Sequence, residues 1–134
     1  MQCILKNMWN KKAVGVLREK GYKLTPQRLK LLEIIDELGP SHPSLSEVFK
    51  KIKEEFPTMS FSTLYSNVMA LKELGLIEVF SVEGETRVEI NTEPHVNLIE
   101  NGEIVDLTDP EIIELIKEKL RKEVKLVNVL IKGG

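Results

Sequence analysis

A chain of 134 residues has the size of one domain or of two very small ones, and its 42% apolar and 30% charged residues allow a buried core in a soluble protein. The formal net charge is −2, no stretch approaches the roughly 20 apolar residues that cross a bilayer, and residues 1–10 lack the pattern of a secretion signal, so we expect a cytoplasmic protein that does not enter a membrane. A single cysteine, Cys3, excludes a disulfide framework and a cysteine-built zinc site within the chain.

Two helices are predicted near the start of the chain. Lys11–Lys20 has the pattern of a short basic helix that ends at Gly21. Thr25-Pro26 then supplies an N-cap and a proline at the first helical position. The helix that follows ends at Gly39-Pro40, and its apolar residues recur at helical spacing: Leu29, Leu31, Leu32, Ile34, Ile35 and Leu38.

The next segment predicts two further helices and a hairpin. Ser44 and Glu47 form a capping-box pattern that opens a helix closed by Pro57, and Ser60 caps a helix that runs to about Leu74. Two strand-like segments follow, joined by residues 82–85: Leu76–Ser81 and Thr86–Ile90. The order of helices followed by a hairpin is that of a winged helix-turn-helix.

The remainder of the chain predicts a separate β-β-α-β unit. Val96–Glu100 and Glu103–Leu107 flank Asn101-Gly102, a strong hairpin signal. A helix follows to about Lys122, and Val124–Ile131 is rich in β-branched residues. A unit of about forty residues buries little by itself, and pairing with a second copy is the simplest remedy. We therefore expect an α+β protein with a winged-helix DNA-binding domain at residues 1–91 and a small dimerisation domain at residues 92–134.

The helix Ser60–Leu74 has the composition of one that contacts DNA. Its apolar residues fall on one face, and small hydroxyl side chains, an amide and Tyr65 fall on the other. The second helix of a helix-turn-helix offers its exposed N-terminal residues to base edges in the major groove, where such groups form hydrogen bonds and contact thymine methyls. The same pattern also fits an ordinary polar surface, or a winged helix that docks a protein.

The net charge is unevenly distributed in a way that favours a nucleic-acid partner. Residues 1–30 carry eight lysines and arginines against one acid, Glu19, whereas the rest of the chain is acidic. Attraction to phosphates depends on the local patch and not on the total charge. A solvated amphipathic helix would give the same run, so charge alone does not decide.

Seven short motifs follow one another in a characteristic order. They are Gly21-Tyr-Lys-Leu-Thr-Pro-Gln-Arg28, His42-Pro-Ser44, Ser60-Phe-Ser-Thr-Leu-Tyr65, Leu74-Gly-Leu-Ile77, Thr86-Arg-Val-Glu89, Glu93-Pro-His95 and Gly102-Glu-Ile-Val-Asp106. In this order and spacing they closely resemble the ferric uptake regulator family, which includes peroxide-sensing regulators. The resemblance covers nearly the whole chain after Lys11, and it implies a homodimeric repressor in which a divalent metal bound between domains sets the geometry for binding operator DNA.

The resemblance also assigns residues to DNA contacts. By position, Tyr65 is similar to the family's base-contacting tyrosine and Lys23 to its minor-groove lysine. Ser66 stands where many members have a phosphate-binding arginine, which affects one backbone contact and leaves the docking mode as in the family. The complete set of predicted DNA contacts is Lys23, Arg28, Ser62, Thr63, Tyr65, Ser66 and Asn67.

The two histidines of the chain, His42 and His95, fall where the family places regulatory metal ligands. Glu89 and Asp106 match its carboxylate ligands, whereas Asn97 stands where a further histidine is usual. Two imidazoles with two carboxylates suit Mn(II), Fe(II), Co(II) or Zn(II). Each residue also has a simpler interpretation as a turn, a linker or a surface charge, and an amide at position 97 is a weaker ligand.

The family's structural zinc site is not expected here. The family's Cys-x-x-Cys is replaced by Leu98–Gly102, and the chain stops at Lys132-Gly-Gly134 where a second cysteine pair usually follows.

Three functions remain to be compared. The first is a dimeric repressor that binds double-stranded DNA and responds to a metal or to peroxide, between which this sequence does not distinguish. The second is a winged-helix protein that binds DNA constitutively or acts as a protein-interaction module. An enzyme is disfavoured because the sequence has no nucleophile motif and no glycine-rich phosphate loop.

Overall fold

The computed structural model describes residues 8–132, so Cys3 lies outside the described residues. The chain divides into two units, Met1–Asn91 and Thr92–Gly134. Among the described residues, no helix is both long and apolar enough to span a membrane.

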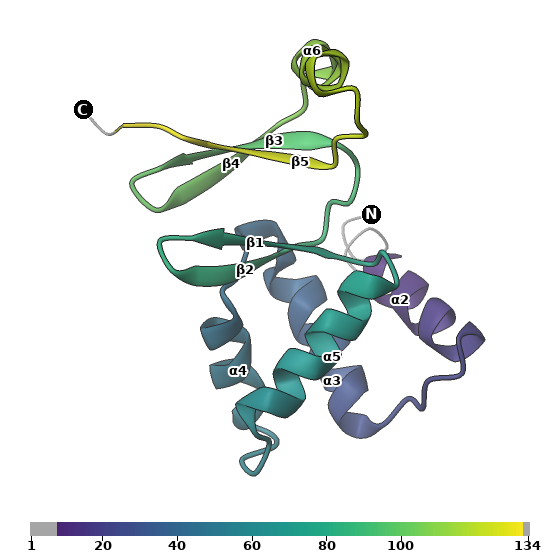
Figure 1. The fold of residues 1–134 in the computed structure, drawn as a ribbon. Coiled ribbons are helices and arrows are strands. Elements are labelled where there is room, and N and C mark those ends of the chain that lie inside the picture. Colours follow the sequence, from purple (N-terminus) through teal and green to yellow (C-terminus); the bar gives the residue numbers. More distant parts are fainter. Residues whose placement is uncertain (1–7, 133–134) are drawn as a thin grey trace. The chain divides into compact units, whose positions relative to one another are not determined.

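The first unit consists, over its described residues, of helices that precede a two-stranded hairpin (Figure 1). The elements are α2 (Met8–Glu19), α3 (Pro26–Leu38), the 3₁₀ turn η1 (Gly39–Ser41), α4 (Leu45–Lys53), α5 (Phe61–Glu73), β1 (Glu78–Val82) and β2 (Glu85–Glu89). The predicted winged helix-turn-helix is thereby confirmed.

Side-chain caps set the N-termini of three of these helices, as the sequence predicts. The Thr25 hydroxyl accepts a hydrogen bond from the backbone N–H of Arg28 at 3.2 Å. Ser44 and Glu47 form a complete capping box at the start of α4. Ser60 accepts from the backbone N–H of Thr63 at 3.2 Å. These bonds satisfy amide groups that have no partner within the helix.

Two predicted helix boundaries in the first unit are wrong. Helix α4 ends at Lys53 and not at Pro57. The residues that follow form a turn, in which the N–H groups of Glu54, Glu55 and Phe56 donate to the Lys51 and Ile52 carbonyls. Helix α2 begins at Met8 rather than at Lys11. Its first turn is held by Trp9, whose indole N–H donates to the Leu76 carbonyl at 2.8 Å.

The core of the first unit lies where α3, α4 and α5 meet. Leu29, predicted to lie in the apolar stripe of α3, is 42% exposed, because the stripe is wider than the surface that the neighbouring helices cover. The side chains that are at most 1% exposed include Leu32, Ile34, Ile35, Val48, Ile52, Leu64, Val68, Ile77 and Val88.

The β1–β2 hairpin, called the wing below, closes the first unit. Val82 pairs with Glu85, so both strands reach closer to the turn than predicted. The two residues between them, Glu83 and Gly84, have φ of 50° and 82°. Positive φ at both central positions is the geometry of a type I′ turn, whose twist matches that of the flanking strands.

The second unit is a three-stranded sheet with one helix, as predicted. It contains β3 (His95–Glu100), β4 (Glu103–Leu107), α6 (Pro110–Leu120) and β5 (Leu126–Leu130), with strand order β4-β3-β5. β4 is antiparallel to β3, and β5 is parallel to it. Asn101 and Gly102 have φ of 51° and 81°, which confirms the predicted tight hairpin. Helix α6 stops at Leu120, before the predicted Lys122, because Arg121 takes the left-handed conformation.

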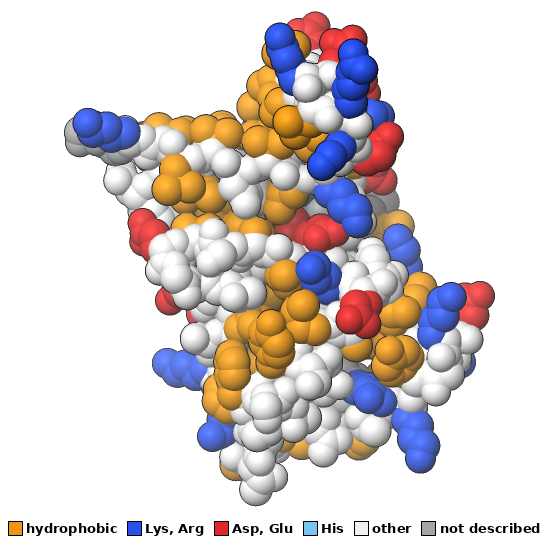
Figure 2. Space-filling model, viewed as in Figure 1, with side chains coloured by type: hydrophobic (Ala, Val, Ile, Leu, Met, Phe, Trp, Pro, Cys, Tyr) orange, Lys and Arg blue, Asp and Glu red, His pale blue; other side chains and the backbone are white. Residues whose placement is uncertain are grey.

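The second unit buries few of its apolar side chains. Only Val96, Ile99 and Ile113 among its described large aliphatic residues are buried. Hydrophobic side chains gather beneath α6 and continue along the surface of the sheet (Figure 2). The exposed ones are Val105, Ile112, Leu115, Leu120, Val129, Leu130 and Ile131.

Gly39 offers a test of the packing where α3 ends. A Cβ at this position would lie 2.6 Å from Cδ1 and 2.9 Å from Cγ2 of Ile90, so the Gly39→Ala variant overpacks a filled site. We expect its free energy of unfolding, measured by urea denaturation, to fall by about 1–3 kcal/mol. Gly15→Ala in α2, where a Cβ meets nothing within 4 Å, is the matched control and should be neutral or stabilising. Equal stability of the two variants would contradict this account.

Candidate nucleic-acid interface and metal ligands

Helix α5 presents its predicted DNA-contacting face to solvent. Leu64, Val68 and Leu71 are buried on the other side of the helix, and this packing fixes the rotation of the helix about its axis. Tyr65 is 46% exposed. The other predicted contacts on this helix are also accessible: Ser62, Thr63 and Ser66 are exposed, and Asn67 is half-buried.

The hydroxyl groups at the start of α5 are ordered by one residue. Ser60 Oγ lies 2.9 Å from Thr63 Oγ1 and 3.2 Å from Ser62 Oγ, within hydrogen-bonding distance of both. Two of the predicted contact residues are thus held in place by the capping residue of the helix. Ser60 itself was not among the predicted contacts, although its capping position identified it in the sequence.

Arg28 contacts two of the other predicted contact residues. Its Nη1 donates to the Lys23 carbonyl at 2.8 Å, and its Nε donates to Asn67 Oδ1 at 3.4 Å. The guanidinium carbon also lies 5.4 Å from the centre of the Tyr22 ring, within the range of a cation–π contact. Sequence reasoning missed Tyr22, because no periodic pattern relates it to Arg28.

A polar hollow of about 420 Å³ lies beside Arg28, at the N-terminal ends of α3 and α5. Hydroxyl, amide and guanidinium groups line this hollow and are open to solvent on one side of the helix-turn-helix. The hollow is lined by Thr25, Gln27, Arg28, Phe56, Thr58, Met59, Ser60, Thr63 and Asn67. Such groups are the donors that proteins use for phosphate oxygens and base edges. Gln27 and Thr58 were not predicted to lie here.

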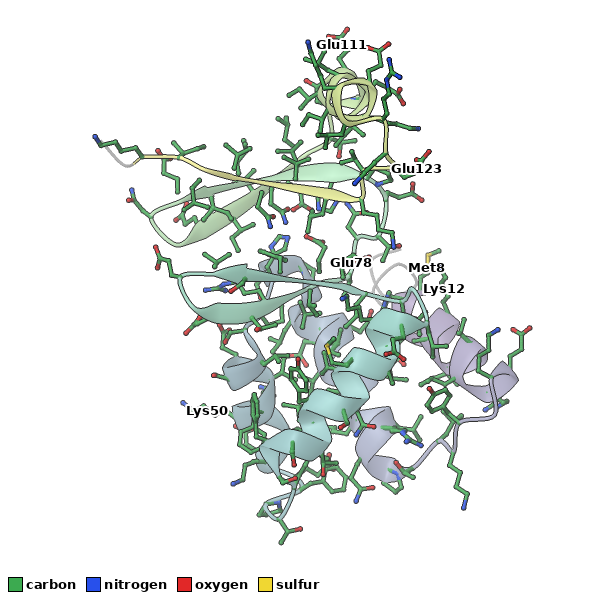
Figure 3. The ribbon with its side chains drawn as sticks, viewed as in Figure 1. Met8, Lys12, Lys50, Glu78, Glu111 and Glu123 are labelled. Atoms are coloured by element: carbon green, nitrogen blue, oxygen red, sulfur yellow. The ribbon has the colours of Figure 1, made fainter. Side chains whose placement is uncertain are left out.

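Lysines surround the helical part of the first unit. Lys12 on α2 and Lys50 on α4 project outward from it (Figure 3), and Lys23 is exposed in the loop before α3. Lys30 differs, since its Nζ lies 3.5 Å from a carboxylate oxygen of Glu33 and 3.7 Å from one of Glu55. Lys12, Lys23 and Lys50 are therefore solvated, whereas Lys30 is paired with acidic side chains.

The first pair of predicted metal ligands is formed within the first unit. His42 Nε2 lies 2.9 Å from Glu89 Oε2, and both side chains are buried, with relative exposures of 5% and 2%. The other oxygen of Glu89 accepts a hydrogen bond from the backbone N–H of Asn91 at 3.0 Å. The edge of the His42 ring meets the Phe80 ring at a centroid distance of 6.0 Å.

Strand β2 holds the backbone of His42 as well as its side chain. His42 has the left-handed conformation, with φ of 52°, which is uncommon for a residue other than glycine. Arg87 Nη1 donates to its carbonyl at 3.0 Å, and the N–H of Val88 donates to the next carbonyl, that of Pro43, at 2.9 Å. Arg87 was missed from the sequence, although it alternates with Glu89 along the strand.

The second pair of predicted ligands is formed within the second unit. His95 Nε2 lies 3.8 Å from Asp106 Oδ1, and the His95 Nδ1 atom is 2.7 Å from the Glu93 carbonyl. Asn97, which is fully buried, pairs across the sheet with Asp106 on β4. Its amide nitrogen donates to Asn128 Oδ1 on β5 at 3.3 Å.

Each pair has separations that suit two ligands of one metal ion. Ligand atoms at about 2.1 Å from one ion lie about 3.0 Å apart at a right angle and farther apart at wider angles. The 2.9 Å and 3.8 Å separations fall in that range. The bond between His95 Nδ1 and the Glu93 carbonyl directs Nε2 toward the carboxylate, a support that metal-binding histidines commonly have. A direct histidine–carboxylate hydrogen bond accounts equally well for the shorter distance.

Comparison with known proteins gives a consistent result. Residues 19–132 match the sequence model of the ferric uptake regulator family. A ferric uptake regulation protein homolog of Archaeoglobus fulgidus is 52% identical over 124 residues, which cover 92% of this chain and 97% of the relative. The crystal structure of the Campylobacter jejuni peroxide stress regulator has a TM-score of 0.65 at 29% identity, covering 89% of this chain and 94% of that one. The Helicobacter pylori ferric uptake regulator, a structure with three functional metal binding sites, has a TM-score of 0.71 at 20% identity, covering 94% and 91%.

Proposed function

The chain belongs to the ferric uptake regulator family, whose members are DNA-binding transcription regulators and not enzymes, and on that premise we propose that it is a homodimeric, cytoplasmic repressor controlled by a divalent metal ion. In this proposal residues 1–91 bind operator DNA and residues 92–134 dimerise. The observation that carries the proposal is the outward polar face of α5, on which Tyr65 is exposed while Leu64, Val68 and Leu71 are buried behind it.

The proposed DNA interface combines α5 with the loop before α3. Tyr65 and Ser66 on α5 are exposed and accessible to base edges or to the adjacent phosphates. The exposed Lys23 contributes a positive charge from the loop, and such charges attract the DNA backbone regardless of base sequence. The wing follows α5 directly in the chain, which is the order of elements in a winged helix-turn-helix.

Replacing Tyr65 tests whether α5 contacts bases. The Tyr65→Ala variant should bind a duplex from the gene's own upstream region more weakly by about 1–3 kcal/mol, because one side-chain contact to a base edge is lost. Fluorescence anisotropy at fixed salt measures the change. The matched control is Lys72→Ala at the other end of α5, which should alter affinity much less. Unchanged affinity of the Tyr65 variant would remove this residue from the interface.

The proposed dimer is held by the second unit. A unit of this size buries too little apolar surface to be stable alone, and its exposed side chains include Leu115 at 54% and Val105 at 58%. Glu111 of α6 points away from the sheet (Figure 3), and Leu115, one turn later, lies on the same side of the helix. Covering the exposed apolar side chains of this unit with the same surface of a second copy gives a closed, symmetric assembly.

Introducing a charge into this apolar surface should disrupt the dimer. We expect Leu115→Glu to shift the protein toward monomer in light scattering at micromolar concentration, because each dimer would bury two carboxylates without partners. Glu118→Gln on the same helix is the control and should leave the molecular mass unchanged. A wild-type protein that is monomeric at that concentration would refute the proposed assembly.

The proposed regulatory metal is bound by His42, Glu89, His95 and Asp106. The two imidazoles and two carboxylates suit Mn(II), Fe(II) or Zn(II). Glu89 and His95 are six positions apart in the sequence, and covalent geometry alone keeps them within roughly 20 Å of each other. An ion held by ligands from both domains would favour one arrangement of the hinge between them, because its affinity differs between the arrangements.

Constitutive DNA binding is the alternative, and one distance favours it. The 2.9 Å contact between His42 and Glu89 is short enough for a hydrogen bond that satisfies both groups in the absence of a metal. Under this alternative the wing and the His42 loop are joined permanently. The two possibilities differ in whether a chelator changes DNA affinity.

Metal dependence can be measured directly. We expect wild-type protein to bind Mn(II) in isothermal titration calorimetry and to bind DNA more tightly with Mn(II) than with a chelator. His95→Ala should lower metal affinity by at least about tenfold and abolish this difference, because it removes a ligand. The affinity for Mn(II) should also fall as the pH is lowered, since protons compete with the metal for imidazole and carboxylate. Equal DNA affinity with chelator and with Mn(II), in the wild type, would establish the constitutive alternative.

A further inference from the structure

Arg28 joins the loop before α3 to helix α5, which is distant along the chain. Its guanidinium group contacts the loop before α3 through the Lys23 carbonyl at 2.8 Å and through the Tyr22 ring. It contacts α5 through Asn67 Oδ1 at 3.4 Å. Its own backbone N–H is fixed by the Thr25 cap. The side chain therefore links the loop that carries Lys23 to the helix that carries Tyr65.

The loop between α2 and α3 has few other restraints near Lys23. Its last backbone bond to α2 runs from Tyr22 N–H to the Leu17 carbonyl at 2.9 Å, and the first bond of α3 runs from Leu29 N–H to the Thr25 carbonyl at 3.0 Å. Lys23 lies between these two bonds and its side chain is exposed. The bond from Arg28 to its carbonyl falls at this point of the loop.

We infer that Arg28 and Asn67 form a brace that positions Lys23 for DNA binding, so that Arg28 acts through Lys23 and does not itself contact the DNA. Two of the guanidinium nitrogens and one face of the group are already used within the protein. A brace of this kind orders the loop before DNA arrives, which reduces the conformational entropy lost on binding. The inference rests on the proposed DNA-binding function and adds a division of roles among its residues.

A direct contact between Arg28 and a phosphate makes different predictions. Removal of a phosphate-binding charge weakens binding uniformly and lowers the slope of log affinity against log salt concentration by about one. Such a loss adds to the loss caused by removing Lys23. A brace instead makes the two losses interdependent, because a positioning residue has nothing to position once the lysine is gone.

The test is a double-mutant cycle between Lys23→Ala and Asn67→Ala. Asn67→Ala cuts the brace while leaving every charge of the interface in place. The probe is a duplex selected by the wild-type protein from a random-sequence pool, and affinity is measured by anisotropy over a series of salt concentrations. We expect Asn67→Ala to weaken binding by about tenfold when Lys23 is present and by less than about twofold in the Lys23→Ala background.

Arg28→Met and Ser66→Ala complete the experiment. Added to Lys23→Ala, Arg28→Met should leave the salt slope unchanged, whereas a direct phosphate contact lowers it by about one more. Ser66→Ala, on the same helix as Asn67, should combine additively with Lys23→Ala. Thermal unfolding of each variant shows whether it is folded at the assay temperature, and the cycle on Asn67 decides the matter if Arg28→Met is not.

Each outcome has a distinct meaning. Strong coupling of Asn67 to Lys23, with no further change in salt slope for Arg28→Met, supports the brace. Additive losses in the Lys23–Asn67 cycle overturn the brace. A lower slope for Arg28→Met also overturns it and makes Arg28 a direct contact. If the wild-type protein selects no duplex at all, the proposed DNA-binding function fails, which is a different result from either.

Discussion

The rotation of helix α5 about its axis is the constraint on which the proposed DNA interface depends. Burial of Leu64, Val68 and Leu71 removes apolar surface from water, and each large side chain contributes on the order of 1.5–3 kcal/mol to stability. With 3.6 residues per turn, these three positions fix the direction of every other side chain on the helix. Tyr65 and Ser66 are exposed because they lie on the side of the helix opposite the buried hydrophobic positions. Core packing thus orients the surface that meets a partner.

The wing positions the two candidate metal ligands of this domain, His42 and Glu89. Strand β2 holds the His42 loop by a side chain, Arg87, and by the backbone N–H of Val88, while Glu89 from the same strand meets the His42 ring. Because His42 has a left-handed backbone, its position depends on these bonds rather than on local preference. A change in what Glu89 and His42 bind would therefore alter the position of the wing directly.

The two units differ in how much apolar surface each one buries. The first unit buries one cluster of side chains from four helices and the wing, and each helix begins with tertiary or capping support. The second unit has a short sheet and one helix, and more of its large aliphatic side chains are exposed than buried. This exposed apolar surface calls for a further partner. That difference is why a dimer is proposed through this part of the chain.

The sequence by itself determined the caps at Thr25, Ser44 and Ser60, the existence of the two hairpins and the order of the elements, because these features depend on residues close together in the chain. It also identified the family, through motifs at fixed spacing. The ends of α2 and α4 were wrong, since a tertiary bond from Trp9 extended one and a turn before Pro57 shortened the other.

The links made by Arg87 and Arg28 were decided only by the tertiary structure. Each joins groups that are well separated in the sequence, Arg87 to His42 and Arg28 to Asn67. Long, flexible side chains reach many acceptors, and periodicity places them on a face without choosing the partner. The choice is made when the helices pack, because packing brings one particular carbonyl or amide within hydrogen-bonding distance. The roles of His42, Glu89, His95 and Asp106 as ligands stay predictions, since donor chemistry can be read from the chain whereas occupancy requires an ion to be bound.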